Sequence, residues 1–469
     1  WFNRVGLPDF LKTRLVNTLH ERGVELEFSR MRLSLVHGLV ADNVRAGTGR
    51  TPDSATFNAR SVRLRLDFPA LWHRRLQLDG LVLRDGNFSL PLSPTNVLAL
   101  TNLQTELRFG PDDTWSLDHF RADFAGAQIN IRGELAHAPE AADWKLFTGG
   151  GTNGGAPYAS LKNFSDALQK IHFEGEPRLQ LNLSGDARNV HSVSVRLDAD
   201  AVGVQTPWFH ARDFQVSARL TAPENSPDND EASWGFWTNL QPFRLDWSVR
   251  LGELRAEKLN ADTLACDGVW SAPELAVTNF SARLDGGQLD ASARLDVATR
   301  QLDFTNRFDF DPRQLALWLP ENARTTLAKI AWTLPPALRA EGSLRLPPWT
   351  QVAADWPVEV ASSLQLRGEL TATNFTVADA ALDRMQARFR YTNSVLSLTN
   401  LTLVQGRTQL AFSGQGDLAT KHFQTAVNGQ LDAASARPFL PSGNLVNEFA
   451  ALTTNTPLAL ALDVRGNWQ

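Results

Sequence analysis

The residue types that carry most enzyme chemistry are present in this chain, but their spacing matches no known catalytic or metal-binding pattern. No two of its nine histidines have the i, i+4 spacing of a helical zinc motif. The chain also lacks a nucleophile elbow, a phosphate-cradling glycine loop and a dinucleotide fingerprint. The sequence does not exclude a pair of catalytic carboxylates for glycoside cleavage, because folding can bring together two residues that are far apart in the chain. We therefore predict a non-enzymatic protein without metal or cofactor. The histidines are His20, His37, His73, His119, His137, His172, His191, His210 and His422.

The cysteine content and the charge of the chain exclude further classes of protein. The single cysteine, Cys266, can form neither an intrachain disulfide nor a thiolate metal site alone. The acidic run from Asp228 to Glu231 lacks the ligand spacing of a calcium loop, so we expect a solvated loop there. The net charge is −5 and no basic stripe is present, which argues against nucleic acid as a partner.

Hydrophobic periodicity predicts one helix followed by many strands. Leucines at helical spacing between Pro8 and Gly23 predict an N-terminal helix. Beyond it the period changes to two, as where Val62, Leu64 and Leu66 alternate with charged residues, and Asp85-Gly86 predicts a hairpin turn. Such two-faced alternation is typical of antiparallel sheet with one wetted side.

An internal repeat organises the strands. At an offset of 121 residues, from Leu275 to Leu396, Thr278-Asn279 falls on Thr399-Asn400 and Gln288-Leu289 falls on Gln409-Leu410. A partial earlier copy precedes the second by 160 residues, from Gln128 to Gln288. We expect each copy to be a strand meander followed by a helical insert, over 161–171, 311–331 and 432–452.

These patterns predict six segments and an all-β fold. The fold is expected to be an elongated repeat antiparallel β-sheet curled into an apolar groove, with an N-terminal helix and short helical inserts. The segments are the helix at 1–23, an N-terminal β module at 24–99, a first repeat at 100–190, connecting strands and an acidic loop at 191–242, a second repeat at 243–348 and a third repeat at 364–469.

The apolar face of these strands is the candidate site. Helical inserts are too few and short to cover it, and large exposed apolar patches are rare without a purpose. We expect Arg63, Arg65, Gln180 and Asn182 on the convex side of the sheet and the apolar residues on the concave side. The predicted groove lining is Val62, Leu64, Leu66, Leu179, Leu181, Leu289, Leu295, Leu410, Leu460 and Leu462.

Further motifs are the leading helix running into 23–28, the stretches 38–44 and 78–92, and the C-terminal motifs beginning at Leu396 and Thr408. Together these segments resemble the AsmA-like family of envelope proteins. This resemblance implies bridge-like lipid transfer, in which a β-groove in the periplasm binds or conducts lipid acyl chains, with phospholipid as the expected lipid. It also implies a Gram-negative-type bacterium and anchorage in the inner membrane. The chain begins at Trp1 rather than Met, so we expect the anchor upstream of it.

Two other functions stay open from the sequence. A bare sheet edge or the groove would suit a scaffold that assists outer-membrane protein assembly, with other envelope proteins as partners. A carbohydrate-binding or adhesion repeat would instead need aromatic platforms on the wetted faces. The sequence does not decide among these classes.

Overall fold

The computed structural model describes most of the chain beyond residue 24. The predicted N-terminal helix, the acidic run at 228–231 and nearly all of the inserts at 161–171 and 432–452 lie outside the described residues. The described residues are 25–34, 38–47, 56–67, 69, 73, 78–93, 96–124, 126–143, 170–222, 232–241, 243–257, 259–284, 286–318, 321–351, 359–360, 362–377, 380–432 and 457–467.

The chain divides into two compact units. The first unit comprises residues 1–225 and 243–247, and the second comprises residues 226–242 and 248–469. Strand β13 (Arg244–Ala256) contributes residues to both. Both units are built almost entirely of strands, so the predicted all-β, antiparallel fold class is confirmed.

The first unit is a sheet in which nearly every pairing is antiparallel. Strands β1 and β2 both pair with β3, and β3 to β8 then pair in chain order. Strand β10 joins β8 in parallel and β11 antiparallel, and β11 also pairs with β9 and β12. The elements are β1 (Glu25–Glu27), β2 (Arg30–Ser34), β3 (Gly38–Gly47), β4 (Thr56–Leu66), β5 (Leu78–Ser93), β6 (Asn96–Phe109), η1 (Pro111–Asp113), β7 (Trp115–Phe124), β8 (Ala127–Ala136), η2 (Ala138–Asp143), β9 (His172–Glu174), β10 (Arg178–Asp186), β11 (Asn189–Gln205) and β12 (Phe209–Thr221).

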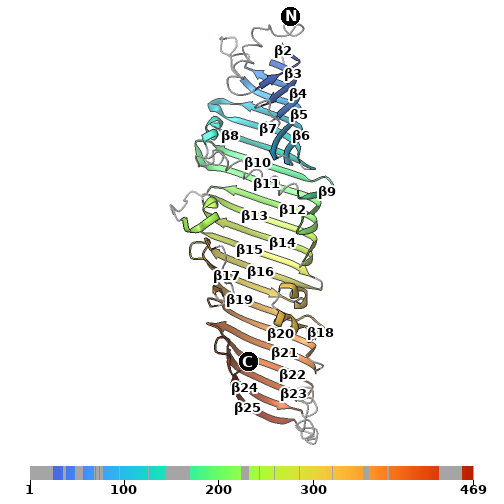
Figure 1. The fold of residues 1–469 in the computed structure, drawn as a ribbon, viewed down its shortest axis with the longest axis vertical. Helices are drawn as coiled ribbons and strands as arrows, with labels where there is room; N and C mark the ends of the chain where they lie inside the picture. Colours follow the sequence, from blue (N-terminus) through green and yellow to red (C-terminus); the bar gives the residue numbers. More distant parts are fainter. Residues whose placement is uncertain are drawn as a thin grey trace. The chain divides into compact units, whose positions relative to one another are not determined.

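The second unit is an antiparallel sheet in chain order from β14 to β25, apart from one short strand (Figure 1). Strands β18 and β19 lie end to end along β20, and β19 connects β20 to β17. The elements are η3 (Ala232–Leu240), β14 (Asn260–Ser271), β15 (Glu274–Leu284), β16 (Gly287–Asp296), β17 (Gln301–Phe308), η4 (Pro312–Trp318), α5 (Glu321–Ala328), β18 (Ile330–Trp332), β19 (Ala337–Arg345), β20 (Gln365–Val377), β21 (Ala380–Thr392), β22 (Val395–Gln405), β23 (Thr408–Asp417), β24 (His422–Leu431) and β25 (Leu458–Asn467).

The predicted 121-residue register is confirmed in the strand bounds of the second unit. Strand β15 maps onto β22 and β16 onto β23 at both ends, and β17 and β24 begin at matching positions. The earlier copy at 160 residues is also seen, because β8 maps onto β16 at both ends. The second helical insert is confirmed as η4 and α5.

The repeated Thr-Asn dipeptide marks a β-bulge. The pairing of β15 with β16 shifts between Val277 and Phe280, and the pairing of β22 with β23 shifts at the equivalent positions. The Thr278 hydroxyl donates to the Asp267 carbonyl oxygen at 3.2 Å, and Thr399 makes the equivalent bond to Arg388. A bulge bends its strand and increases the local twist, so these recurring bulges help to curl the sheet.

One turn prediction was wrong. Asp85-Gly86 does not reverse the chain, because β5 continues through both residues to Ser93. Asp85 has a positive φ of 51° and lies where the pairing with β6 shifts register. An Asp-Gly pair supplies the left-handed conformation that a tight turn needs, and a bulge can use the same conformation.

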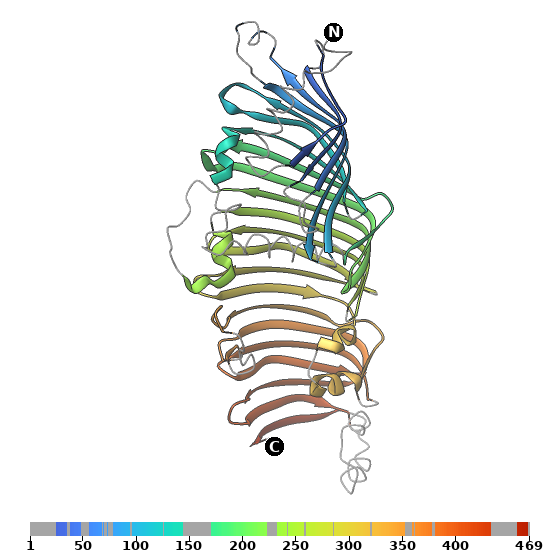
Figure 2. The ribbon, with the colours of Figure 1, turned by 45° about the horizontal axis from the view of Figure 1, so that its top comes forward.

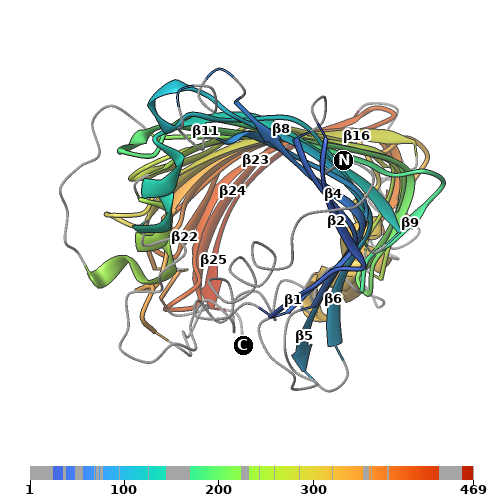
Figure 3. The same cartoon turned by 90° about the horizontal axis from the view of Figure 1, so that it is seen from above.

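The strands are curved, and the helical elements lie beside them. In the view from above, β23, β24 and β25 are bent into arcs (Figure 3). Among the described elements, most contacts are between neighbouring strands of the sheet. Helix α5 packs mainly against η4 and β18. The helical segments are seen at the ends of strands (Figure 2). Among the described residues, no helix is long and apolar enough to cross a membrane.

Candidate functional site

An unbroken apolar row crosses the first unit at right angles to its strands. Cross-strand pairing places one apolar residue or glycine from each strand directly beside the next. All members are half-buried. We call this set the first apolar row: Leu33, Leu39, Leu64, Leu81, Leu107, Leu117, Gly133, Leu183, Val195 and Leu220.

A second row of the same kind crosses the second unit from β14 to β25. Every member is apolar, and most are half-buried, although Leu462 on β25 is 50% exposed. Since neighbouring strands lie roughly 4.8 Å apart, a row over this many strands extends for roughly 40–50 Å. We call this set the second apolar row: Leu264, Ala282, Leu289, Phe308, Leu338, Leu370, Ala387, Leu401, Phe412, Val427 and Leu462.

Phenylalanines fill the gaps that glycines leave on the same face of the second unit. A Cβ added to Gly342 would lie 3.0 Å from the ring of Phe304, and one added to Gly368 would lie 2.6 Å from the ring of Phe389. Phe423 covers Gly466 in the same way at 3.0 Å. The aromatic ring of one strand thus lies across the glycine of its neighbour, which keeps the apolar surface continuous.

The predicted lining residues of the first unit lie on these apolar rows or beside them. Leu64 belongs to the first apolar row, and Val62 and Leu181 share the next row. Leu179 pairs with Ile129, and Leu66 with Leu78. Val62 also packs against two buried clusters, around Ala59 and Met31.

The predicted residues of the second unit form three groups. Leu289 and Leu462 belong to the second apolar row. Leu410 and Leu460 flank Gly429 on neighbouring strands. Leu295 is buried and pairs with Leu275 and Leu302. The structure therefore places the predicted residues in these rows or near them within each unit, on strands that are in several cases far apart.

Three tryptophans form an aromatic cluster in the second unit. Trp237 stacks on Trp270 with ring centroids 5.1 Å apart and meets Trp349 edge-on at 5.8 Å. The indole N–H groups of Trp270 and Trp349 donate to the backbone carbonyls of Leu240 and Val297, each at 2.8 Å. This cluster fixes η3 at the strand ends, so we assign it a structural role.

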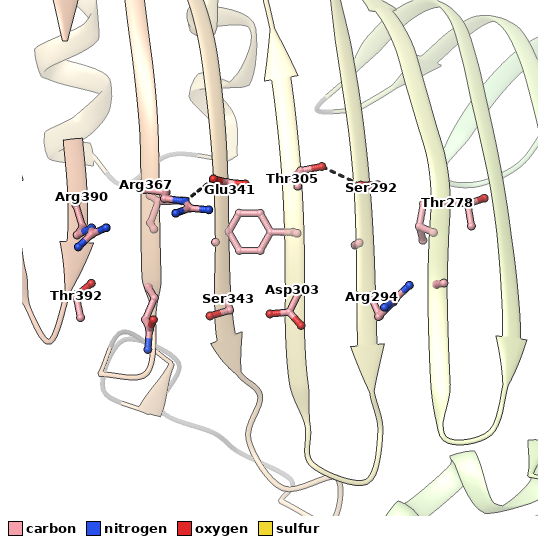
Figure 4. A pocket seen from close by; sticks show the side chains of 17 residues that line it. Thr278, Ser292, Arg294, Asp303, Thr305, Glu341, Ser343, Arg367, Arg390 and Thr392 are labelled. Atoms are coloured by element: carbon pink, nitrogen blue, oxygen red, sulfur yellow. Dashed lines mark hydrogen bonds and ion pairs between the residues drawn. The ribbon is translucent and has the colours of Figure 1, made fainter. Parts of the chain in front are cut away.

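The described hollows lie on the opposite, polar face, and the sequence analysis missed them. Two adjoining hollows over β16 to β21 share Ser292, Thr305, Glu341, Arg367 and Arg390 (Figure 4). None of the ten predicted lining residues lines either hollow. Part of this site could have been predicted from the sequence. Strands β20 and β21 form a hairpin, and its short turn determines that Arg367 faces Arg390.

Ion pairs and hydrogen bonds hold some of the charged residues on the polar face, and Asp267 is an example. Asp267 accepts hydrogen bonds from Arg250 and Asn279, both at 3.1 Å. The pKa of Asp267 lies below its ordinary value. The hydrogen bond from the Ser248 side chain lowers it most, and those from Asn279 and Arg250 lower it further. The carboxylate is therefore an anchored structural group and a poor proton acceptor at neutral pH.

Groups suited to metal binding do not converge in the described part of the chain. No group of three or more His, Cys, Asp or Glu side chains there is placed to hold a metal ion. Cys266 is half-buried and unoxidised on β14. The apolar rows and the polar hollows are therefore the arrangements that we consider as ligand sites.

These features define an all-β repeat protein with one apolar and one polar sheet face. Comparison of the chain with protein-family models, with curated proteins and with solved structures finds no match.

Proposed function

We propose that the chain is a non-enzymatic lipid-binding protein whose apolar rows hold or conduct acyl chains. The observation that carries the proposal is the half-burial of the apolar rows over many consecutive strands. In a two-layered sheet protein such residues would be covered by a second sheet or by helices. No described element covers these rows in that way.

The chemistry of the rows suits a chain-like apolar ligand. They contain no charged side chain, so binding depends on apolar area, at about 0.8 kcal/mol per buried CH₂ group. Each strand offers a similar surface, and a ligand therefore meets no single anchoring residue. We further propose, from the family resemblance, that phospholipid is the ligand and that the protein acts in the periplasm from an inner-membrane anchor.

A paired substitution tests lipid binding. Leu289→Asp combined with Leu410→Asp places two carboxylates on the apolar face at equivalent positions of two repeats. An unpaired charge there costs several kcal/mol or draws in water, so we expect co-purifying lipid and lipid transfer in vitro to be lost. The matched control, Leu289→Ala with Leu410→Ala, should keep both, and circular dichroism should show unchanged strand content in each variant.

Two results would count against this function. Normal lipid transfer by the aspartate variant would show that the apolar face is not the binding surface. Unfolding of that variant, with the alanine variant folded and free of lipid, would assign the leucines to a closed core.

A scaffold role is the second candidate, and one observation favours it. Among the described strands, β25 pairs only with β24, and Leu462 and Val464 on it are 50% and 44% exposed. An open edge of this kind is a template for an added strand of a partner. Proline substitution at Ala461, within β25, should abolish partner binding through the edge while leaving acyl-chain binding intact.

A further inference from the structure

Two pairs of arginines face each other across neighbouring strands of the second unit. Arg307 on β17 is directly opposite Arg339 on β19, and Arg367 on β20 is directly opposite Arg390 on β21. Like charges placed directly opposite in an antiparallel ladder are destabilising. The backbone register fixes these positions, so rearrangement of the strands cannot separate the pairs.

The nearby carboxylates neutralise only part of this charge. Glu341 forms an ion pair with Arg367, and Glu369 lies 3.6 Å from Arg388. Asp290 accepts a hydrogen bond from the Gln288 side chain at 2.7 Å. In the strand register Asp290 is directly opposite Arg307 and Glu369 is directly opposite Arg339. Within the described part of the chain, however, Arg307, Arg339 and Arg390 form no close ion pair, and all three are exposed.

These arginines line one of the hollows on the polar face. Its lining contains five arginines, namely Arg307, Arg339, Arg367, Arg388 and Arg390, against three carboxylates, Asp290, Glu341 and Glu369. The hollow therefore carries two positive charges in excess. Hydroxyl groups of Ser292, Thr305 and Thr399 lie among them as neutral hydrogen-bonding groups.

The adjoining strand supplies no further negative charge. Arg388 pairs in register with Asn400 on β22, and Arg390 with Ser397. Arg367 and Arg390 lie on neighbouring strands beside Glu341 and Thr305 (Figure 4). The carboxylates of this part of the sheet therefore offset the arginines only in part, and the hollow keeps its excess of two positive charges.

We propose that this hollow binds a ligand carrying two linked phosphate groups. A guanidinium presents paired N–H donors that match phosphate oxygens in a bidentate arrangement, which an ammonium cannot do. Arginines on adjacent strands are spaced roughly 4.8 Å apart at the backbone, so two guanidiniums can engage two neighbouring phosphates. The ligand also removes the repulsion within both arginine pairs. This site lies on the face of the second unit opposite the second apolar row and does not depend on the acyl-chain proposal.

Titration calorimetry with inorganic pyrophosphate on the full chain, at low ionic strength, tests the proposal. We expect saturable binding that weakens at least tenfold in the double variant Arg339→Gln with Arg390→Gln. The matched control is Arg196→Gln, because Arg196 is exposed but already held by Asp198 at 2.8 Å. This control should bind pyrophosphate as the unchanged chain does.

Thermal unfolding without ligand separates binding from folding. Because each glutamine removes one member of a like-charged pair, the double variant should melt at the same temperature as the unchanged chain or higher. A lower melting temperature would assign these arginines a structural role and would overturn the proposal. Equal pyrophosphate affinity in the double variant, or no affinity in the unchanged chain together with none for anionic vesicles, would also overturn it.

Vesicles distinguish the source of the phosphate groups. Binding to vesicles containing cardiolipin, which carries two phosphates, and not to phosphatidylcholine vesicles would assign the hollow to a lipid headgroup, provided that the double variant loses it. Pyrophosphate binding without vesicle binding would assign a free diphosphate ligand. Both outcomes support the site.

Discussion

The first and second copies of the repeat differ by one strand, and this difference reverses the direction of a neighbouring strand. In the second copy β16 is followed by the antiparallel strand β17, which then pairs with β19. In the first copy β8 pairs directly with β10, so no strand lies between them, and the two run parallel. A parallel neighbour requires a long connection, and residues 137–177 provide it.

The apolar face tolerates this change because side-chain alternation does not depend on strand direction. Ile129 pairs with Leu179 and Ile131 with Leu181 across the parallel junction. The first apolar row also crosses the junction, from Gly133 to Leu183. The comparison teaches that the repeat conserves the face of each residue more strictly than the order of its strands.

The largest expected effect comes from a charge at a position that both copies bury. Ala122 is 0% exposed and Ala282, at the 160-residue offset, is 1% exposed. Aspartate at either position should cost several kcal/mol, because the carboxyl group has to be buried there either as an unpaired charge or in its neutral form. Hydrogen exchange should quicken in β6 to β8 for Ala122→Asp and in β14 to β16 for Ala282→Asp.

Equal losses at the two positions would show that the copies are equally well packed. A smaller loss for Ala122→Asp would show that the copy with the parallel junction relaxes more easily. Ala122→Ser and Ala282→Ser serve as controls of similar size, and each should cost less than its aspartate counterpart.

The next effect targets the parallel junction itself. A Cβ on Gly133 would lie 2.3 Å from the Leu183 carbonyl oxygen, so Gly133→Ala forces β8 and β10 apart. We expect a loss of roughly 1–3 kcal/mol, as for overpacking elsewhere. The second copy already has Ala293 at this position, and Ala293→Gly should cost only about 0.5–1 kcal/mol. Chemical denaturation of both variants measures the difference, and a neutral Gly133→Ala would contradict the close approach at the junction.

The smallest effect is the pH dependence that Asp186 contributes in the first copy. The backbone N–H of Arg188 donates to Asp186, and this bond together with the His137 side chain, at 2.8 Å, lowers the pKa of Asp186 below its ordinary value of 3.8. The lowered pKa stabilises the fold above about pH 4, and the contribution is lost as pH falls through the folded-state value.

Asp186→Asn removes the titrating group and should flatten this part of the acid dependence. The second copy has Val297 where the first has His137, so the effect should be absent there. Denaturation midpoints at about pH 5 and about pH 3 measure it, and an unchanged acid dependence in Asp186→Asn would assign the effect to other carboxylates.

The sequence predicted the strands and the repeat because both depend on local patterns. Alternation assigned Val62 and Leu64 to one face, and the 121-residue offset placed β22 and β23. The role of Asp85 was predicted wrongly, because an Asp-Gly pair satisfies a bulge as well as a turn. The parallel junction could not be predicted, because strands joined by long connections choose their neighbours through contacts that no local pattern encodes.

The apolar rows and the arginine-lined hollow also differ in how far the sequence predicts them. The predicted leucines lie on the apolar rows or near them, because the side of the sheet that each one faces follows from its alternation along the strand. The opposition of Arg307 and Arg339 depends on a register set across the helical insert, so only the three-dimensional pairing reveals it. The opposition of Arg367 and Arg390 follows from a hairpin and was within reach of sequence reasoning.

The phenylalanine rings that lie across glycines determine how even the surface of the apolar face is in the second unit. Without Phe304, Phe389 and Phe423, the glycines beside them would leave pits one side chain deep. With the rings in place these three pits of the second unit are filled, so an apolar molecule displaced from one strand to the next would lose little contact area there. For the acyl chains that we propose as ligands, such filling would favour continuous displacement over jumps between separate pockets.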